Sequence, residues 1–357
     1  MHVTVYHSLD ELPQSCGQLF EEAGKASFFL TLAWYRNLAG QALPEDCRVR
    51  IYVAYEGDNV HGILPMKFAA ERSSLFACRK LEALSNYYSS LFMPLAVSPG
   101  CLQAIVDEIA RERWDTVDMH PMAQDSTLFE GLVAAMKRSG MSVQPYYCFG
   151  NWYLKVDGRS YRDYSNALPS KLKNTLKRKA RQFSAMSSSM EIITDIDEVD
   201  RAIGAYQKVY DSSWKIREPH PGFMPGLIKL CAEHGWLRLG LAYLGDEPIA
   251  AQLWIVKDGI ASIYKLAYDK NFSRLSAGSL LTARMMEYVI DVDHVSEVDY
   301  LSGDDDYKKD WMSDRRERWG IIAYNKHTPR GVCMGALSRM SGYAKGVVLI
   351  SERGSLG

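Results

Sequence analysis

Alternating apolar and polar positions mark two similar pairs of strands in this chain. One is "RIYVAYEGDNVHGILPM" (Arg50–Met66), and the other is "RLGLAYLGDEPIAAQLW" (Arg238–Trp254). In each, an alternating strand leads into Ala-Tyr-x-Gly-Asp, and a second apolar strand follows. Since Gly-Asp is typical of tight turns, both segments are predicted to be β-hairpins. Ala54-Tyr55 matches Ala242-Tyr243, 188 positions later, which indicates either two copies of one unit or a chance likeness.

A second match follows each hairpin in the same order. "SPGCLQAIVDEIARERWDTVDM" begins at Ser98, and "SAGSLLTARMMEYVIDVDHVSEVDY" begins at Ser276. Both read Ser-x-Gly, then a segment with the helical spacing of apolar residues, then a strand that contains Val-Asp. Because order and spacing are both kept, the sequence favours an internal duplication over chance.

Each copy is predicted to contain helices, antiparallel strands, the Ser-x-Gly segment, a helix and a last strand. This order indicates an α/β fold of the α+β type, in which each unit is a mixed, mostly antiparallel sheet flanked by helices. We place the first unit at 1–157 and the second at 158–327, with a basic helical insertion at 168–185. Residues 328–357 are predicted to form a C-terminal helix and tail.

The junction between strand and helix in the second copy is a candidate anion site. The strand Ile260–Tyr268 alternates, and helical spacing resumes after Gly278. Free backbone N–H groups and the helix dipole attract an anion at such a junction. Gly278 would let a phosphate approach the backbone, and Arg274 would pair with its charge. The predicted cradle comprises Arg274, Ser276, Ala277, Gly278 and Ser279, and the alternative is a polar turn capped by Ser276.

The first copy differs at one position of this junction. It keeps Ser98 and Gly100 but has Ala96 where the second copy has Arg274. Maintenance of the fold thus needs Ser-x-Gly, whereas the arginine is additional. This comparison favours a phosphate site in the second unit and a degenerate donor site in the first.

Composition restricts the partners of the chain. The 357 residues are 47% hydrophobic and 24% charged, as in soluble globular proteins. A formal net charge of −1 gives no signature of binding to DNA, so any basic surface must be local. "LPSKLKNTLKRKARQF" (Leu168–Phe183) has six basic residues and no acid. We expect it to be either a solvated helix face or a contact to a phosphorylated substrate through Lys173, Arg178 and Arg181.

Other features predict a cytoplasmic protein without a bound metal. The N-terminus, "MHVTVYHSLDELP", lacks the basic flank and apolar core of a signal peptide. No stretch approaches the roughly 18 apolar residues of a membrane span. The seven cysteines lack C-x-x-C spacing and the eight histidines lack ligand spacing, so we expect reduced thiols and no metal site.

The second copy resembles a known family. "SIYKLAYDKNFSRLSAGSLLTARMMEYVI" and "VDYLSGDDDYKKDW" are similar to the CelD/BioF2-like acetyltransferase-domain family. That family is a branch of the GCN5-related acyltransferase (GNAT) superfamily and is related to the FemABX peptidoglycan aminoacyltransferases. The resemblance covers Ser160–Trp319 well and the first half more loosely. It implies tandem acyltransferase folds, in agreement with the duplication, and transfer of an acyl group from acyl-CoA such as acetyl-CoA.

Two details of the resemblance concern the donor. The superfamily cradle usually reads Gln/Arg-x-x-Gly-x-Gly/Ala, whereas this chain has "RLSAGS" with a single glycine. FemABX relatives use aminoacyl-tRNA and carry an aromatic residue followed by a lysine, which corresponds to Tyr307-Lys308 here. The resemblance implies that Lys308 or backbone N–H groups hold the oxyanion, and it leaves aminoacyl-tRNA as the alternative donor.

The remaining candidates surround these segments. Asp304 would accept a proton from the attacking amine if its pKa were raised, whereas adjacent carboxylates in a loop are usually solvated. Trp214 and Lys215 would border the acceptor cleft or pack, and Tyr87-Tyr88 would bind a sugar or form a turn. The catalytic candidates are Lys308, Tyr307, Asp304 and Tyr268. The substrate-binding candidates are Lys173, Arg178, Arg181, Trp214, Lys215, Tyr87, Tyr88 and Lys265.

Together these features predict an acyltransferase that moves an acyl group from acyl-CoA to an amine or hydroxyl of a polysaccharide or cell-envelope precursor. The acceptor would be a small molecule or carbohydrate, with a phosphate if the basic helix binds it. No nucleophilic triad is visible, which favours direct transfer without a covalent enzyme intermediate. The alternatives are a FemABX-like transferase that depends on aminoacyl-tRNA and a non-catalytic binding module for an envelope precursor.

Overall fold

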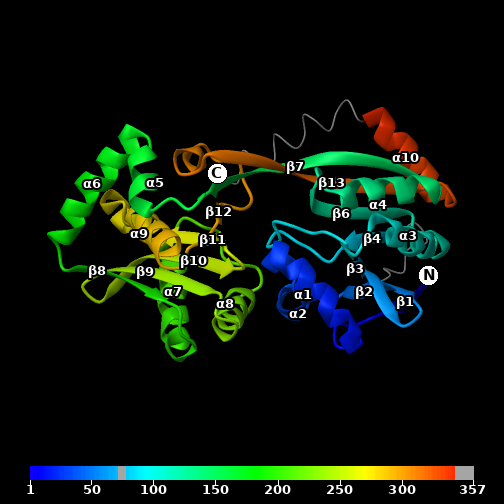
Figure 1. Cartoon of the computed structure of the whole chain (residues 1–357), viewed down its shortest axis with the longest axis horizontal. Helices are drawn as coiled ribbons and strands as arrows, with labels where there is room; N and C mark the ends of the chain where they lie inside the picture. The colour runs from blue at the N-terminus through cyan, green and yellow to red at the C-terminus, as the bar shows by residue number, and fades with distance from the viewer. Residues whose placement is uncertain (71–77, 342–357) are drawn as a thin grey trace. The chain divides into compact units, whose positions relative to one another are not determined.

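The computed structural model describes residues 1–70 and 78–341, so the predicted tail beyond 341 lies outside the described residues. Contacts divide the chain into two compact units (Figure 1). The first unit comprises Met1–Ala23, Pro44–Cys148 and Arg318–Gly357, and the second comprises Gly24–Leu43 and Phe149–Glu317. All seven cysteines are free thiols.

The first unit has a mixed sheet. Its antiparallel neighbours are β1 (His2–Tyr6), β2 (Cys47–Glu56), β3 (Asn59–Ala69) and β4 (Lys80–Ala83). Strand β6 (Thr116–Ala123) runs parallel to β4, β13 (Asp314–Asn325) pairs antiparallel with β6, and β7 (Met141–Lys155) follows. The short β5 (Leu95–Ala96) pairs with β3. The helices are α1 (Gly17–Ala26), which ends in the second unit, α3 (Leu102–Arg111), α4 (Thr127–Arg138) and α10 (Pro329–Ser341), with 3-10 turns η1 (Gln14–Cys16) and η3 (Pro99–Cys101).

The second unit repeats this arrangement. Strands β8 (Ser188–Ile193), β9 (Leu237–Leu244), β10 (Glu247–Lys257) and β11 (Ile260–Tyr268) are antiparallel neighbours. Strand β12 (Glu297–Asp299) runs parallel to β11, and the end of β7 pairs antiparallel with β12. The helices are α2 (Leu32–Gln41), α5 (Tyr161–Ala167), α6 (Ser170–Ser184), α7 (Val199–Ser212), α8 (Phe223–Glu233) and α9 (Ala277–Asp291). The 3-10 turns are η2 (Phe28–Leu30), η4 (Ile196–Glu198), η5 (Lys270–Leu275) and η6 (Asp306–Asp310).

The two hairpins of the predicted duplication have the same register. In the first unit Tyr55 pairs with Val60 and Ala54 with Gly62, so one residue of β3 is skipped. In the second unit Tyr243 pairs with Pro248 and Ala242 with Ala250, so one residue of β10 is skipped. A β-bulge at the same place in both copies is a specific feature, because bulges are kept where they shape a sheet. The prediction of two tandem α/β units with mixed, mostly antiparallel sheets is confirmed.

The compact units exchange strands, which explains why their boundaries differ from the tandem ranges predicted at 1–157 and 158–327. Asp118 of β6 pairs with Ile322 of β13, from the C-terminal half of the chain. Asp299 of β12 pairs with Tyr153 of β7, from the N-terminal half. Each unit therefore completes its sheet with a strand from the other half of the sequence. The ranges 1–157 and 158–327 therefore remain a prediction of where each copy of the repeat begins and ends, whereas the compact units say which residues pack together.

In the second unit, packing leaves one edge of β11 free. Helix α9 contacts β9, β10 and β11, and α7 contacts the same strands from the other side (Figure 1). Strand β12 pairs with β11 only along Ile260–Ser262, so β11 continues to Tyr268 without β12 beside it. Backbone groups need hydrogen-bond partners, and an unpaired edge next to a helix N-terminus is therefore a place where a ligand can bind.

Candidate active site

The first turn of α9 offers unused hydrogen-bond donors. Asp269 caps the preceding turn η5 by accepting a hydrogen bond from Asn271 N at 2.8 Å. Ser276 then has the left-handed conformation, with φ 56°, and its side chain makes no cap hydrogen bond. The first helical hydrogen bond runs from Leu280 N to Ser276 O at 3.1 Å. The N–H groups of residues 277–279 therefore lack an acceptor within the helix, and the alternative of a turn capped by Ser276 loses its expected contact.

Gly278 is not required by the fold around it. A Cβ at this position would lie 3.4 Å from Tyr268 Cδ1, which is an ordinary van der Waals contact. Glycine in a helix costs roughly 0.5–1 kcal/mol relative to alanine, so its presence favours close approach of another group. The buried Gln252 fixes this turn, because its Nε2 donates to Gly278 O and Thr282 Oγ1, both at 2.8 Å.

The corresponding turn of the first unit is closed. Pro99 occupies the first helical position after Ser98, so this turn has one N–H fewer. Gly131 of α4 packs against it, since a Cβ at 131 would lie 2.5 Å from Pro99 Cβ. Both features agree with the expectation of a degenerate donor site in the first unit.

Three predicted lysines come together in the second unit. Burial and, to a smaller extent, the nearby positive charges of Lys265 and Lys308 lower the pKa of Lys215 to about 8, against an opposing effect of Glu218. Lys265 Nζ donates to Glu218 Oε1 at 2.8 Å, and Tyr210 OH donates to the same oxygen at 2.6 Å. The carboxylate of Glu218 thus balances part of the positive charge of the three lysines.

An aromatic pair joins the lysines to the α9 turn. The rings of Trp214 and Tyr268 have centroids 4.4 Å apart at an interplanar angle of 43°. Lys215 Nζ lies 5.8 Å from the centre of the Trp214 ring, and Tyr268 lies against Gly278. Trp214 is nevertheless 52% exposed, so a substrate can reach this pair. The predicted residues Trp214, Lys215, Lys265, Tyr268 and Gly278 therefore form one continuous set.

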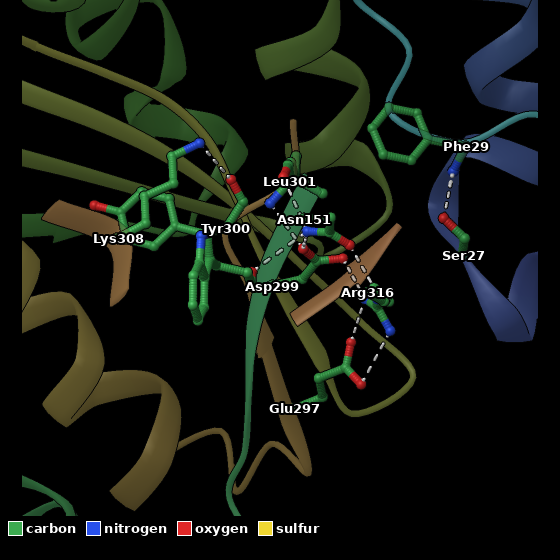
Figure 2. Close-up of polar contacts among 10 residues, drawn as sticks. Ser27, Phe29, Asn151, Glu297, Asp299, Tyr300, Leu301, Lys308 and Arg316 are labelled. Carbon is green, nitrogen blue, oxygen red and sulfur yellow. Dashed lines mark hydrogen bonds and ion pairs between the residues drawn. The ribbon is translucent and has the colours of Figure 1, made fainter. Parts of the chain in front are cut away.

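Lys308 is buried, at 4% exposure. Its Nζ donates to Ser302 O at 2.6 Å and, more weakly, to Gly303 O at 3.4 Å. It also donates weakly to Tyr300 O at 3.4 Å (Figure 2). Burial lowers its pKa, and Asp305, with an oxygen 3.3 Å from Nζ, opposes this effect. The neighbouring Lys309, by contrast, is exposed and pairs with Asp306 at 2.9 Å.

A clamp around Asp299 holds the turn that contacts Lys308. Asp299 accepts hydrogen bonds from Asn151 Nδ2 and Leu301 N on Oδ1 and from Arg316 Nη2 on Oδ2, at 2.5–2.7 Å (Figure 2). Asn151 Nδ2 also donates to Leu301 O at 2.9 Å, and Arg316 reaches Glu297 at 2.7 Å. Leu301 has φ 54°, which is unfavourable for a leucine, so these contacts fix a strained turn.

The structure does not support Asp304 as the base. The predicted role requires a raised pKa, but a hydrogen bond from Arg315 lowers the pKa of Asp304. Arg315 Nη2 lies 2.7 Å from Asp304 Oδ2, and Trp152 Nε1 donates to Oδ1 at 2.8 Å. Tyr307 packs edge-on against Tyr300 at 5.7 Å, and burial raises its pKa to about 12. Of Asp304 and Tyr307, only Tyr307 stays protonated at neutral pH, and it lies beside the turn that surrounds Lys308.

The other predicted residues fall into three groups. Arg274 is exposed at the end of η5, and its carbonyl accepts a hydrogen bond from Lys179 of α6. On α6, Arg178 and Arg181 are exposed, whereas Lys173 Nζ donates to Asn166 O at 2.7 Å. Tyr87 and Tyr88 belong to the first unit, where their rings lie 4.1 Å apart.

Sequence reasoning missed four residues of this site. They are Asn151, Glu218, Gln252 and Arg316. Gln252 interrupts the apolar run "PIAAQLWIV", and a buried polar residue in such a strand is the signal that could have found it. The other three carry no local signal, because their partners lie far away in the sequence.

Among residues 1–70 and 78–341, no group of His, Cys, Asp and Glu side chains has the arrangement of a metal site. The helices in the same residues include none that is long and apolar enough to cross a membrane.

Comparisons with known proteins identify part of this chain directly. Residues 170–309 match the family model of the acetyltransferase (GNAT) domain. This range contains the α9 turn, the aromatic pair and all three lysines. No curated protein in the comparison matches the sequence.

Solved structures extend the similarity to nearly the whole chain. FemX superposes with a TM-score of 0.62 at 10% identity, covering 94% of this chain and all of that one. A tandem GNAT protein from the clavulanic acid biosynthesis pathway gives 0.51 at 10% identity and covers 90% and 98%. L-PGS from Bacillus licheniformis gives 0.51 at 12% identity and covers 85% and 94%. The chain therefore has a GNAT-superfamily, FemABX-related fold, carries a GNAT acetyltransferase domain at residues 170–309, and is an acyltransferase.

Proposed function

We propose that the second unit transfers an acyl group from acyl-CoA to an amine or hydroxyl of a carbohydrate or cell-envelope precursor. The observation that carries this proposal is the open first turn of α9, connected through Tyr268 and Trp214 to a cluster of three lysines. Donor phosphates would bind the N–H groups of residues 277–279, with Gly278 allowing their approach and Arg274 pairing with their charge. In this proposal the single glycine of "RLSAGS" is enough to bind the phosphates, because the backbone N–H groups of Ala277 and Ser279 lie in the same helical turn as that of Gly278.

The acyl group would then lie along the free edge of β11, towards the lysines. The amine or hydroxyl attacks the thioester carbonyl, the carbon–sulfur bond breaks, and CoA leaves as a thiol after taking up the proton. Negative charge develops on the carbonyl oxygen, and the ammonium groups of Lys215 and Lys308 stabilise it. Glu218, which accepts a hydrogen bond from Lys265, would take the proton from the acceptor in place of Asp304.

A pocket next to Glu218 supports a small acceptor. It has a volume of about 390 Å³ and is lined by residues that include Tyr206, Tyr210, Arg217, Glu218 and Met224. Mixed aromatic and polar walls of this size are typical of sites for small ligands. One of the structural neighbours is the C-terminal domain of a putative lysylphosphatidylglycerol synthetase from Agrobacterium fabrum, with a TM-score of 0.52 at 12% identity. That similarity supports an acceptor from the cell envelope.

Calorimetric titration of the purified protein with acetyl-CoA and with desulfo-CoA tests the donor. We expect both to bind, and we expect thiol release from acetyl-CoA when a panel of amino sugars and sugar phosphates is added. Lack of binding by both CoA compounds would contradict the acyl-CoA proposal. The same titration with Lys270→Ala serves as a control, because Lys270 is an exposed cation of the same turn outside the proposed cradle.

One contact favours a second candidate donor. Lys179 of α6 donates to the Arg274 carbonyl, so the basic helix adjoins the proposed phosphate turn. A donor with many phosphates could use both elements, as in transfer from aminoacyl-tRNA. Filter binding with an aminoacyl-tRNA mixture tests this candidate, and tight binding without any CoA binding would favour it over acyl-CoA.

A further inference from the structure

We propose that α6 is a docking surface for an anionic lipid bilayer, with an adjacent groove that takes a hydrocarbon chain. The side chains of Lys171, Lys177, Arg178 and Arg181 are exposed and have no hydrogen-bond or ion-pair partner among the described residues. Several other exposed cations of this unit are paired, for example Arg201 with Glu191 at 2.8 Å and Lys208 with Glu247 at 2.8 Å. On α6, four exposed cations without a partner in the described part of the chain lie within the eleven residues 171–181.

The charges occupy one face of α6. At about 100° per residue, the four exposed cations fall within an arc of about 120°, and the apolar stripe lies opposite. Leu172, Leu176 and Phe183 form that stripe and pack into the core of the unit, against α9 and β8 (Figure 1). Helix α6 therefore stays folded through its apolar face and presents to solvent a face with four basic residues and no acid.

This distribution opposes helix stability. Lys171 and Lys173 lie in the first turn, where the helix dipole disfavours cations, and no acid accompanies them. Lys173–Lys177 and Lys177–Arg181 are like-charge pairs at i,i+4 spacing, which repel each other. Such charges are unfavourable in the isolated protein, and an array of anionic groups would turn each into a favourable contact.

A groove runs along the edge of the basic face. Its volume is about 540 Å³, and its lining includes the apolar side chains of Leu176, Phe183, Met190, Leu280 and Ala283. The exposed Lys177 also lines it, as do Arg284 and Glu287, which pair with each other at 2.7 Å. Most of the apolar lining is not aromatic, and Phe183 is buried, which suits a hydrocarbon chain better than nucleic-acid bases, because bases stack on exposed aromatic faces. A cation at the mouth of an apolar groove matches an amphiphile with a phosphate headgroup. Between the two polyanions that the charges could attract, the groove favours lipid over RNA.

Vesicle flotation of the full chain tests the bilayer. We expect binding to an equimolar mixture of phosphatidylcholine and phosphatidylglycerol, and little binding to phosphatidylcholine alone. Each basic residue near an anionic surface contributes about a factor of five, so the triple variant Lys177→Gln, Arg178→Gln, Arg181→Gln should bind roughly 100- to 200-fold more weakly. This loss should shrink at high salt, because screening already weakens the wild type.

A matched variant separates local from global charge. Arg111→Gln, Lys208→Gln and Lys229→Gln remove the same number of exposed positive charges, each from a surface ion pair. We expect this control to bind vesicles within a few-fold of the wild type. Equal losses in both triple variants, or binding to neutral vesicles as strong as to anionic ones, would overturn the proposal.

A soluble probe tests the groove. We expect monomeric dihexanoyl phosphatidylglycerol to bind at least tenfold more tightly than glycerol phosphate, since each buried methylene contributes to affinity. Ala180→Phe places a ring in the groove without changing charge and should remove this difference. Equal affinity for the two probes would overturn the groove, and RNA binding that depends on α6 while vesicle binding does not would assign the surface to nucleic acid. None of these readouts depends on acyl transfer.

Discussion

Replacement of Lys308 by methionine separates a catalytic from a structural lysine. The variant removes an ammonium that donates to Ser302 O at 2.6 Å and lies 3.4 Å from two further carbonyls. Buried acceptors left without a donor cost about 1–3 kcal/mol, so we expect a destabilisation of roughly 2–4 kcal/mol. A domain with the usual stability of about 5–15 kcal/mol remains folded after this loss, and kinetics can be measured.

The kinetic expectation for Lys308→Met is separate. If the ammonium stabilises charge that appears only in the transition state, its loss lowers kcat by about 10²–10³-fold with little change in KM. Thiol release at saturating acyl-CoA, at a temperature below the unfolding transition of the variant, gives kcat per folded molecule. Urea denaturation gives the stability of the same preparation.

Two variants serve as controls for Lys308→Met. Arg238 forms a half-buried ion pair with Asp293 at 2.6 Å in the same unit, so Arg238→Met should destabilise the fold comparably but leave kcat intact. Lys309→Met removes only an exposed pair with Asp306 and should change neither quantity. The catalytic interpretation is refuted if Lys308→Met loses stability like Arg238→Met and keeps kcat within about threefold, because its role would then be to hold the turn.

Three further predictions concern the donor turn, the lysine cluster and the clamp. Arg274→Ala should weaken CoA binding by roughly 10- to 150-fold without lowering the unfolding temperature, and calorimetry that shows unchanged affinity would reduce the turn to a fold element. Lys215 has a pKa of about 8, so the wild-type kcat should fall between pH 7 and 9 as the cation that stabilises the oxyanion is lost, whereas Lys215→Met should have a lower kcat without this pH-dependent step. Because this pKa is lowered, the same cation also opposes folding below about pH 8, and wild-type stability should rise from there towards pH 10.5. Arg316→Met leaves Asp299 and Glu297 without their counter-charge and should destabilise the protein on the order of 3 kcal/mol in urea denaturation, whereas a loss below about 1 kcal/mol would contradict the clamp.

The repeat could be predicted because its signals are local. Ala-Tyr-x-Gly-Asp sets the turn and the period-2 alternation sets the strands, so both hairpins are visible in windows of a few residues. Ser-x-Gly before a helical period gave the α9 turn in the same way. The bulges opposite Ala54 and Ala242 were not visible, since they depend on the pairing of two strands rather than on either sequence.

The strand exchange could not be predicted from these patterns. β7 and β13 alternate like any other strand, and nothing in their residues states that Tyr153 pairs with Asp299 or Ile322 with Asp118. Partner choice between distant strands depends on the whole fold. The tandem boundaries predicted from the order of elements therefore could not reveal that each unit borrows a strand.

The site shows the same division between local and distant signals. The pair Tyr307-Lys308 came from a family resemblance, but the acidic segment around it reads as solvent-exposed, and the burial of Lys308 was not foreseen. Asn151 and Arg316 are 165 positions apart and meet only through strands β7 and β13. Asp304 was predicted as the base from its acidic neighbours in the sequence, whereas its pKa is lowered mainly by a hydrogen bond from Arg315.

The two copies use one aspartate for different purposes, and this difference explains why only the second forms a site. Asp118 and Asp299 occupy equivalent positions, each in a strand parallel to the fourth strand of its unit. Asp118 accepts a hydrogen bond from Tyr146 at 2.7 Å and pairs with Lys80 at 3.0 Å, so all its contacts join strands of the sheet. Asp299 also joins its sheet to β7 through Asn151, but it binds the backbone of residue 301 as well and so shapes the turn that surrounds Lys308. A carboxylate that held two strands together in both copies has thus become, in the second, the support of a buried cation.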